Sequence, residues 1–128
     1  MEKLLGVVRV HKKLSISNTG NNSIQYRIVI PGPVLKRLEM SNLKYLAFRK
    51  IKEDIQIIKI TGAPSRKINN FMELRRLGKK NRICLPDNII SHFNIADGDY
   101  LKFIERRKND IRLCKLNVDQ YYSAKKQP

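Results

Sequence analysis

The stretch Arg27-Ile28-Val29-Ile30-Pro31 recurs 55 positions later as Arg82-Ile83-Cys84-Leu85-Pro86. One extra residue in a later turn of the second copy moves the offset to 56, and the match then continues to the end of the repeat. Twelve further residues of each copy match in the same order. In the first copy they are Val34, Leu35, Leu38, Met40, Tyr45, Leu46, Phe48, Asp54, Ile55, Ile57, Lys59 and Ile60. Their counterparts in the second copy are Ile89, Ile90, Phe93, Ile95, Tyr100, Leu101, Phe103, Asp110, Ile111, Leu113, Lys115 and Leu116. The chain is therefore predicted to contain two tandem copies of one structural unit.

Each copy begins with an apolar run that a proline ends, which predicts the short buried strands Ile28–Ile30 and Ile83–Leu85. Apolar residues then follow at a spacing that places three of them on one helical face, which predicts a short helix in each copy. Asp87 is the expected N-cap of the second helix, and Gly32 is the expected cap of the first, with Pro33 in the first helical position.

A hairpin is predicted after each helix. In the second copy, Asp97-Gly98-Asp99 is typical of a tight turn in which glycine supplies a positive φ. The following strands are expected at Tyr100–Glu105 and Ile111–Leu116, and Ile55–Ile60 is the equivalent last strand of the first copy. The predicted order is therefore β-β-α-β-β, twice.

The second copy, Phe71 to Leu116, resembles the module of the AbrB/SpoVT-type swapped-hairpin DNA-binding family. The resemblance rests on Gly-Lys-Lys-Asn-Arg-Ile-Cys-Leu-Pro at 78–86, the short helix, Ile-Ala-Asp-Gly-Asp-Tyr-Leu at 95–101 and the final hairpin. The first copy, Leu5 to Ile60, resembles a diverged module in which Leu43 replaces the glycine of the turn. In that family two chains exchange hairpins to close one barrel-like core.

The resemblance implies a mainly β fold with short helices, in which a swapped-hairpin barrel forms within one chain as an intramolecular pseudo-dimer. A unit of about 50 residues is a poor core by itself, so each module needs its partner. The expected divisions are residues 1–60 as the first module, 61–70 as a linker, 71–116 as the second module and 117–128 as a polar tail. At 128 residues and 41% hydrophobic, the chain suffices for one shared core.

The charge points to a polyanionic partner. Lysine and arginine number 27 against 11 aspartates and glutamates, which gives a net charge of +16. The resemblance implies contacts with double-stranded DNA from each module's first strand, first loop and the start of its second strand. The basic residues at these positions are Arg9, Lys12, Lys13 and Arg27, with His11 among them, and Arg75, Arg76, Lys79, Lys80 and Arg82.

Arginine can form bidentate contacts with guanine, whereas lysine acts as a point charge on phosphate. Arg9, Arg27, Arg75 and Arg82 are thus the candidates for base contacts, and the lysines for phosphate contacts. An alternative for Arg27 and Arg82 is that their stems pack on the core at a strand edge. The basic runs Arg49–Lys52 and Arg106–Lys108 are expected at the opposite hairpin turns, as solvated charge, with a secondary nucleic-acid contact as the alternative. A longer loop, Ser15–Ser23, replaces Leu77–Asn81 in the first copy, so the two DNA half-sites are not expected to be identical.

Catalysis finds little support in the sequence. It has two histidines, His11 and His92, and no Ser-His-Asp, HExxH, P-loop or paired-carboxylate pattern. Cys84 and Cys114 have no metal-ligand spacing and are expected to be core thiols. We therefore expect no enzymatic activity, no metal, no cofactor and no small-molecule substrate. No apolar run approaches the roughly 20 residues of a membrane helix, and the expected location is the cytoplasm.

Three DNA-linked functions remain open. A transcriptional regulator ranks first, and an architectural DNA-binding protein ranks second. An antitoxin is less expected, because Asn117–Pro128 carries only one acidic residue, Asp119, whereas such proteins typically wrap a toxin with an extended acidic segment. RNA binding lacks the aromatic strand or GXXG loop that would support it. Further self-association of pseudo-dimers is left open.

Overall fold

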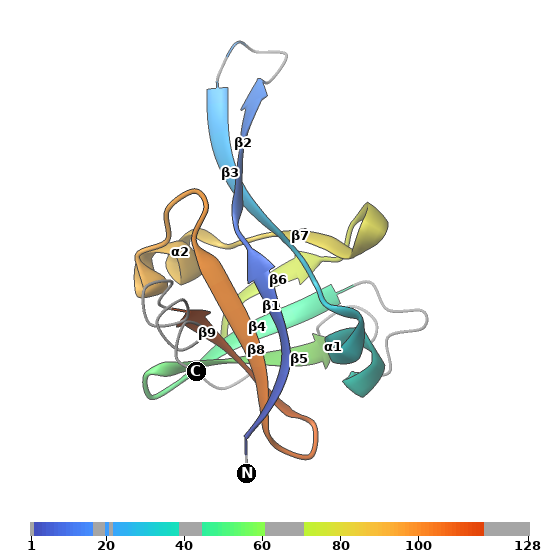
Figure 1. The fold of residues 1–128 in the computed structure, drawn as a ribbon. Helices are drawn as coiled ribbons and strands as arrows, with labels where there is room; N and C mark the ends of the chain where they lie inside the picture. Colours follow the sequence, from blue (N-terminus) through green and yellow to red (C-terminus); the bar gives the residue numbers. More distant parts are fainter. Residues whose placement is uncertain (1, 17–19, 21, 39–44, 61–70, 117–128) are drawn as a thin grey trace, which may run out of the picture.

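The computed structural model describes residues 2–16, 20, 22–38, 45–60 and 71–116, and most of these belong to strands. Figure 1 labels the elements along the chain. In the first half they are β1 (Lys3–Arg9), β2 (His11–Ile16), β3 (Asn22–Val29), α1 (Gly32–Arg37), β4 (Tyr45–Ile51) and β5 (Asp54–Ile60). In the second half they are β6 (Phe71–Arg76), the 3₁₀ turn η1 (Lys79–Asn81), β7 (Arg82–Cys84), α2 (Asp87–Phe93), β8 (Tyr100–Arg107) and β9 (Asp110–Leu116).

The predicted mainly β chain with short helices is confirmed. The second half has the β-β-α-β-β order that the repeat predicts, and the first half differs by a break at Val10 that separates β1 from β2. The predicted linker, the tail and the first-copy turn around Leu43 lie outside the described residues.

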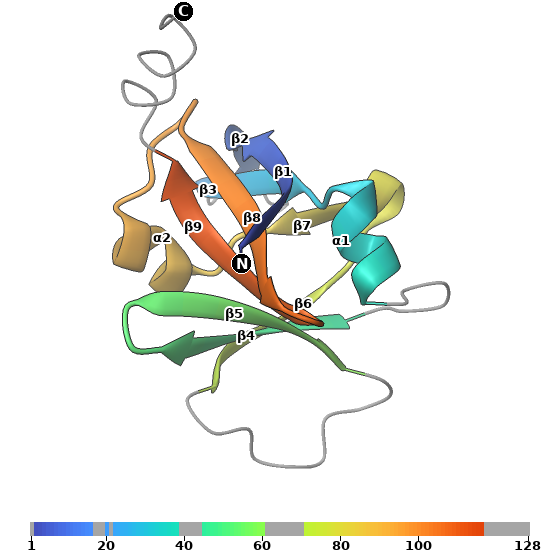
Figure 2. The ribbon, with the colours of Figure 1, turned by 60° about the horizontal axis from the view of Figure 1, so that its bottom comes forward.

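Strands from the two halves share both sheets. The larger sheet has the order β1-β8-β9-β5-β4-β6, and the smaller one has the order β2-β3-β7. Figure 2 shows that the larger sheet is curled, with the hairpins β4–β5 and β8–β9 at its middle. The first strand of each half pairs with the hairpin of the other half: Arg9 lies opposite Tyr100, and Arg76 lies opposite Tyr45.

The core lies between the two sheets and the two helices. Ile28 of β3 and Ile83 of β7 face each other in an antiparallel pair, and both are buried. Val34 of α1 and Ile89 of α2 are fully buried, so each helix supplies one apolar face. The remaining buried core residues, again drawn from both halves, are Leu5, Val10, Ile30, Leu38, Leu46, Phe48, Ile55, Ile57, Leu85, Ile95, Leu101, Phe103, Ile111 and Leu113.

The predicted turn Asp97-Gly98-Asp99 is confirmed, with Gly98 at φ +86°. The turn also joins the two halves, because the amide of Gly98 donates to the carbonyl of Val10 at 3.0 Å and the amide of Val10 donates to the carbonyl of Asp99 at 2.7 Å. The turn is closed by the Asp99 carboxylate, which accepts from the amide of Ala96 at 2.8 Å. The second half therefore fixes the first half at the break between β1 and β2.

Two local predictions are wrong. The N-cap positions are Pro31 and Pro86, neither of which forms a side-chain cap, so Gly32 and Asp87 are the first helical residues. Each proline fixes φ near −60° and leaves the chain extended, which places the helix start immediately after it. The predicted loop Ser15–Ser23 is also shorter than expected, because β2 and β3 continue pairing as far as Ile16 and Asn22.

Within the described ranges, no helix has both the length and the apolar character that crossing a membrane requires.

Candidate nucleic-acid interface

The outer face of the small sheet carries the basic residues that the repeat singled out. Ile28 and Ile83 point into the core, so by strand alternation their neighbours Arg27 and Arg82 point outward. Arg27 lies opposite Cys84, and Arg82 lies opposite Val29. Diagonal neighbours of this kind are about 7–8 Å apart, so the two arginines form a close pair across the junction of the two halves.

Two adjoining surface grooves border this arginine pair. The first, of about 410 Å³, is lined by His11, Lys12, Lys13, Arg27, Ile28, Val29 and Arg82. The second, of about 270 Å³, is lined by Arg27, Arg76, Gly78, Lys79, Arg82, Ile83 and Cys84. Arg27 and Arg82 line both grooves, and none of the lining residues is acidic. Six basic residues thus line the two grooves, although strand alternation directs Lys12, opposite Tyr26, to the other face of β2.

Arg27 is held in place by its neighbour on the same strand face. Its Nη2 atom donates to Oε1 of Gln25 at 2.8 Å, and the same oxygen accepts from the Cys84 thiol at 3.7 Å. Nε of Arg27 is buried and has no hydrogen-bond partner among the described residues. The side chain is half-buried, and the residue lines both grooves.

The loop before β7 places Lys79 beside Arg82. The amide of Gly78 donates to the carbonyl of Arg82 at 2.8 Å, which closes the loop. Lys80 and Asn81 have φ values of 57° and 60°, and the Asn81 carbonyl accepts from the amide of Ile30 at 2.8 Å. The loop is therefore anchored to the other half of the chain, and Lys79 lines the second groove.

Six of the nine predicted contact residues line the two grooves, namely Lys12, Lys13, Arg27, Arg76, Lys79 and Arg82. The other three do not line these grooves. Arg9 is exposed at the end of β1, where its guanidinium lies beside the Gly98 turn. Arg75 is half-buried on β6 opposite Leu46, and Lys80 is exposed in η1.

Two neighbours of the grooves were missed or misplaced from the sequence. Gln25 orients Arg27, and its position two residues earlier on a strand was the available signal. Cys84 was expected in the core, but it is half-buried on the outer face and lines the second groove. Cys114 is also only half-buried, and burial raises the pKa of its thiol.

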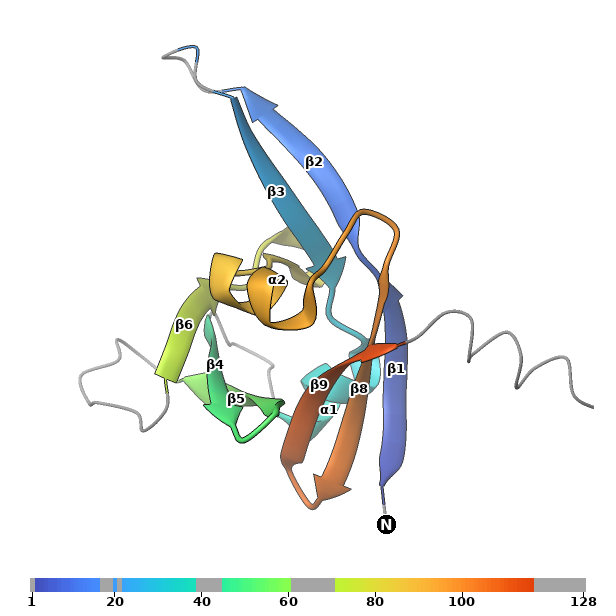
Figure 3. The same cartoon turned by 90° about the vertical axis from the view of Figure 1, so that its left-hand side faces the viewer.

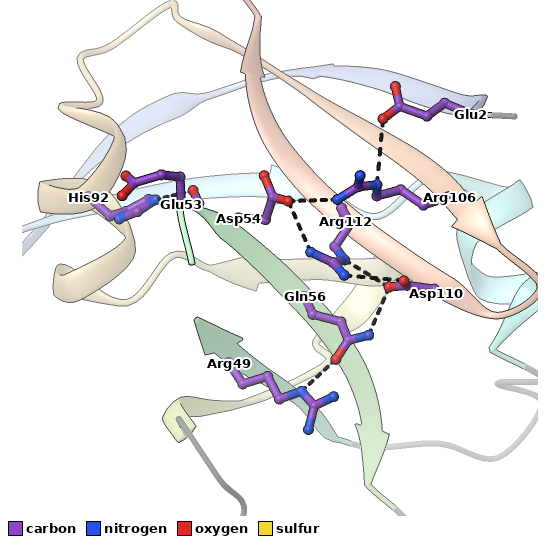
Figure 4. Close-up of polar contacts among 9 residues, drawn as sticks. All are labelled: Glu2, Arg49, Glu53, Asp54, Gln56, His92, Arg106, Asp110 and Arg112. Atoms are coloured by element: carbon purple, nitrogen blue, oxygen red, sulfur yellow. Dashed lines mark hydrogen bonds and ion pairs between the residues drawn. The ribbon is translucent and has the colours of Figure 1, made fainter. Parts of the chain in front are cut away.

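Charge is distributed differently at the other end of the molecule, where Figure 4 shows a network of paired side chains. Arg112 is buried, and its guanidinium contacts Asp110 at 2.8 Å and Asp54 at 3.0 Å. The hydrogen bonds that Arg112 donates to Asp110 lower the pKa of Asp110 and raise the pKa of Arg112. Arg106 contacts Asp54 at 3.0 Å and Glu2 at 3.6 Å.

One arginine of each basic hairpin run has side-chain partners, whereas Lys50, Lys52, Arg107 and Lys108 are exposed. Arg106 is ion-paired with Asp54. Arg49 donates to Oε1 of Gln56, and Nε2 of Gln56 donates to Asp110 at 2.8 Å. His92, on the nearby helix α2, has its Nε2 atom 2.9 Å from the Glu53 carbonyl. Carboxylates and amides at this end therefore pair with the cations around them, whereas the residues that line the two grooves include no acidic one.

In the part of the chain that the structure describes, no three His, Cys, Asp or Glu side chains come together as a metal site would require. Comparison of the chain with protein-family models, with curated proteins and with solved structures gives no match.

Proposed function

We propose that this chain is a double-stranded DNA-binding protein, a transcriptional regulator, that contacts DNA with the outer face of the β2-β3-β7 sheet. The observation that carries the proposal is the position of Arg27 and Arg82, which border two adjoining grooves lined by six cations and no carboxylate. Such a surface suits a phosphate backbone, since cationic side chains that neutralise phosphates release bound counterions.

The proposal includes a swapped-hairpin pseudo-dimer of the AbrB/SpoVT kind. Its support is the cross-pairing of β1 with β8 and of β6 with β4, which gives each half the first strand of the other. The pairing of β3 with β7 and of β5 with β9 also joins equivalent strands of the two copies. Arg27 and Arg82 would then be equivalent residues at the centre of one DNA-binding face.

The contrast between the two ends of the molecule supports this choice of face. At the network end, Asp54, Asp110 and Glu2 lie within ion-pair distance of arginines. A polyanion would meet carboxylates there, and like charges in contact oppose binding. The residues that line the grooves include no carboxylate that would repel a polyanion.

The test is to measure the affinity of the full chain for mixed-sequence duplex DNA over a range of salt concentrations. If all six groove cations contact phosphates, log K should fall with log salt with a slope of about −5. A slope near zero, or equal affinity for any polyanion, would count against the proposal. Selection of a site from random duplexes then separates the two DNA-linked functions, because a regulator should prefer its site by about a thousandfold or more. Tighter binding to duplex RNA than to DNA would instead favour an RNA partner.

A further inference from the structure

A two-stranded arm projects from the body of the protein. Figures 1 and 3 show the hairpin β2–β3 extending away from the larger sheet and from β7. The two strands pair from His11 opposite Arg27 to Ile16 opposite Asn22. Strand β7 pairs only with Arg27–Val29, so among the described residues no third strand accompanies the arm beyond Tyr26. The second half of the chain has the short turn η1 at the equivalent place.

The arm continues the basic face rather than starting a separate surface. Strand alternation places Lys13 and Gln25, which lie opposite each other, on the same outer face as Arg27. Lys13 and Arg27 line the first groove together. The stretch from Lys3 to Leu38, which includes both strands of the arm, contains no aspartate or glutamate. No carboxylate in this stretch would therefore repel a polyanion that extends from the grooves along the arm.

The other face of the arm carries exposed apolar residues beyond Lys12, which lies opposite Tyr26. Leu14 and Ile24 lie opposite each other across the two strands, and they are 56% and 54% exposed. They follow Tyr26 and Ile28 along the face that enters the core. An arm bound through its outer face would leave these two residues away from the nucleic acid.

We infer that the arm lies in the major groove of DNA and contacts it through the face that carries Lys13. The inference rests on the proposed function and adds the groove and the extent of the site. The major groove is about 12 Å wide and admits a two-stranded β-ribbon, whereas the minor groove is only about 6 Å wide. Five residue steps separate the first pair of the arm from the last, and at about 3.3 Å per residue they span about 17 Å. At 3.4 Å per base pair, the arm covers about 5 base pairs.

The arm makes the binding site asymmetric. The body presents Arg27 and Arg82 from equivalent positions of the repeat, but only the first half carries a ribbon beyond them. The contacted DNA thus extends by about 5 base pairs on one side of the body only.

The first test shortens the arm. Replacing residues 14–24 by Asn-Gly joins Lys13 to Gln25, which already lie opposite each other, through a two-residue loop that suits a β-hairpin. The measurement is the shortest mixed-sequence duplex that each protein binds with full affinity. The shortened protein should still bind DNA, but its minimum duplex should be about 3 base pairs shorter than that of the intact chain, because the three residue steps from Lys13 to Ile16 span about 10 Å.

Single substitutions test the contacting face in the intact arm. Lys13→Ala should reduce the salt slope of DNA binding by about 1, as expected for the loss of one phosphate contact. Lys108→Ala removes the same charge from an exposed position at the far β8–β9 turn and should leave the slope unchanged. Leu14→Thr, on the apolar face, should also leave affinity unchanged.

Competition identifies the groove. Methyl green, which occupies the major groove, should displace the arm, so that the intact protein binds as the shortened one does. Netropsin, which occupies the minor groove, should not. The inference is overturned if the intact and shortened proteins need equal duplex lengths, if Leu14→Thr weakens binding more than Lys13→Ala, or if only netropsin competes. In each of these cases DNA binding by the body stands. If the protein bound no duplex with salt-dependent affinity, the proposed function itself would be refuted.

Discussion

Ile28 and Ile83 lie opposite each other at the centre of the β3–β7 pair, and each holds the same place in its own copy of the repeat. Their side chains are only 1% and 2% exposed. The sequence relationship between the two halves is thus also a spatial one, because equivalent residues meet at the junction. Arg27 and Arg82, the preceding residue in each copy, are consequently brought together on the opposite face of the same pair.

The buried pair predicts equivalent losses of stability. Ile28→Ala and Ile83→Ala should each lower the free energy of unfolding by about 2–5 kcal/mol, since each leaves a cavity in the shared core. Denaturant unfolding followed by circular dichroism measures the change. Val29→Thr, at a position 45% exposed on the outer face, is the control and should change stability by less than about 0.5 kcal/mol. A loss confined to one of the two isoleucine variants would contradict a core shared equally by both halves.

The cross-paired strands predict that one half cannot fold alone as a monomer. In a fragment of residues 68–116, β6 would lack β4 and β8 would lack β1, and Ile83 would lose the strand opposite it. We expect the isolated fragment to be unfolded or to form a homodimer, and to fold as a one-to-one complex when residues 1–60 are supplied. Circular dichroism with sedimentation measures both outcomes. A stable monomeric fragment would show that each half is a domain in its own right.

Close packing at Gly6 predicts a contrast between two glycines. A Cβ atom at Gly6 would lie 2.8 Å from Cβ and Cγ of Pro31, whose ring cannot move aside without shifting the chain that enters α1. Gly6→Ala should therefore lower the unfolding free energy by about 1–3 kcal/mol. Gly32 has nothing within 4 Å of such a Cβ, and Gly32→Ala should be neutral or stabilising by up to about 1 kcal/mol. Thermal melting of the two variants measures this contrast. Equal melting temperatures would contradict the close packing of Gly6 against Pro31.

The Asp110–Arg112 pair predicts a loss of stability in acid. The pKa of Asp110 is lowered in the folded state, so its contribution is fully present above the unfolded value of about 3.9 and is lost as the pH falls through the folded value. Asp110→Asn should lower the unfolding free energy by about 1–3 kcal/mol at neutral pH, because it removes charged hydrogen bonds from the buried Arg112.

Denaturant unfolding as a function of pH measures this effect. The difference between the wild type and Asp110→Asn should begin to shrink below about pH 4, where the carboxyl of the unfolded chain takes up protons, and should be lost as the pH falls through the lowered pKa of the folded state. Asp87→Asn, at an exposed position in the first turn of α2, is the matched control. A wild-type advantage that persists unchanged into acid would mean that the Asp110 charge is not responsible.

The repeat explains why much of the local structure was predictable. Apolar spacing marked the strands around Ile28 and Ile83 and the helices that bury Val34 and Ile89, and Gly98 marked its turn. The helix starts were misplaced because Asp87 has the chemistry of a cap, whereas the preceding proline already determines the start. The length of β2 and β3 was missed because Ser15–Ser23 is rich in loop-forming residues, and their pairing depends on cross-strand contacts.

The candidate site depended on pairings between distant residues. Arg9 and Arg76 both lie opposite an equivalent tyrosine of the other half, yet of these two only Arg76 lines either of the two grooves described above. After Arg76 the chain turns back tightly through Gly78 towards Arg82, whereas after Arg9 it departs into the arm. Local sequence cannot separate these two arginines, because the difference arises from the lengths of the following loops. Gln25 was missed for a related reason: its contact with Arg27 requires the full length of β3.

The central claim is that Arg27 and Arg82 form the middle of a DNA-binding face, and duplex affinity of three arginine variants tests it most directly. Arg27→Ala and Arg82→Ala should each weaken binding by about 1–3 kcal/mol with little change in melting temperature, provided that each contacts a base. Arg107→Ala removes the same charge from an exposed position near the far hairpin turn and should leave affinity nearly unchanged. Equal losses in all three variants would mean that net charge alone drives binding, and early melting of the first two would mean that these arginines serve the fold; either result would contradict the claim.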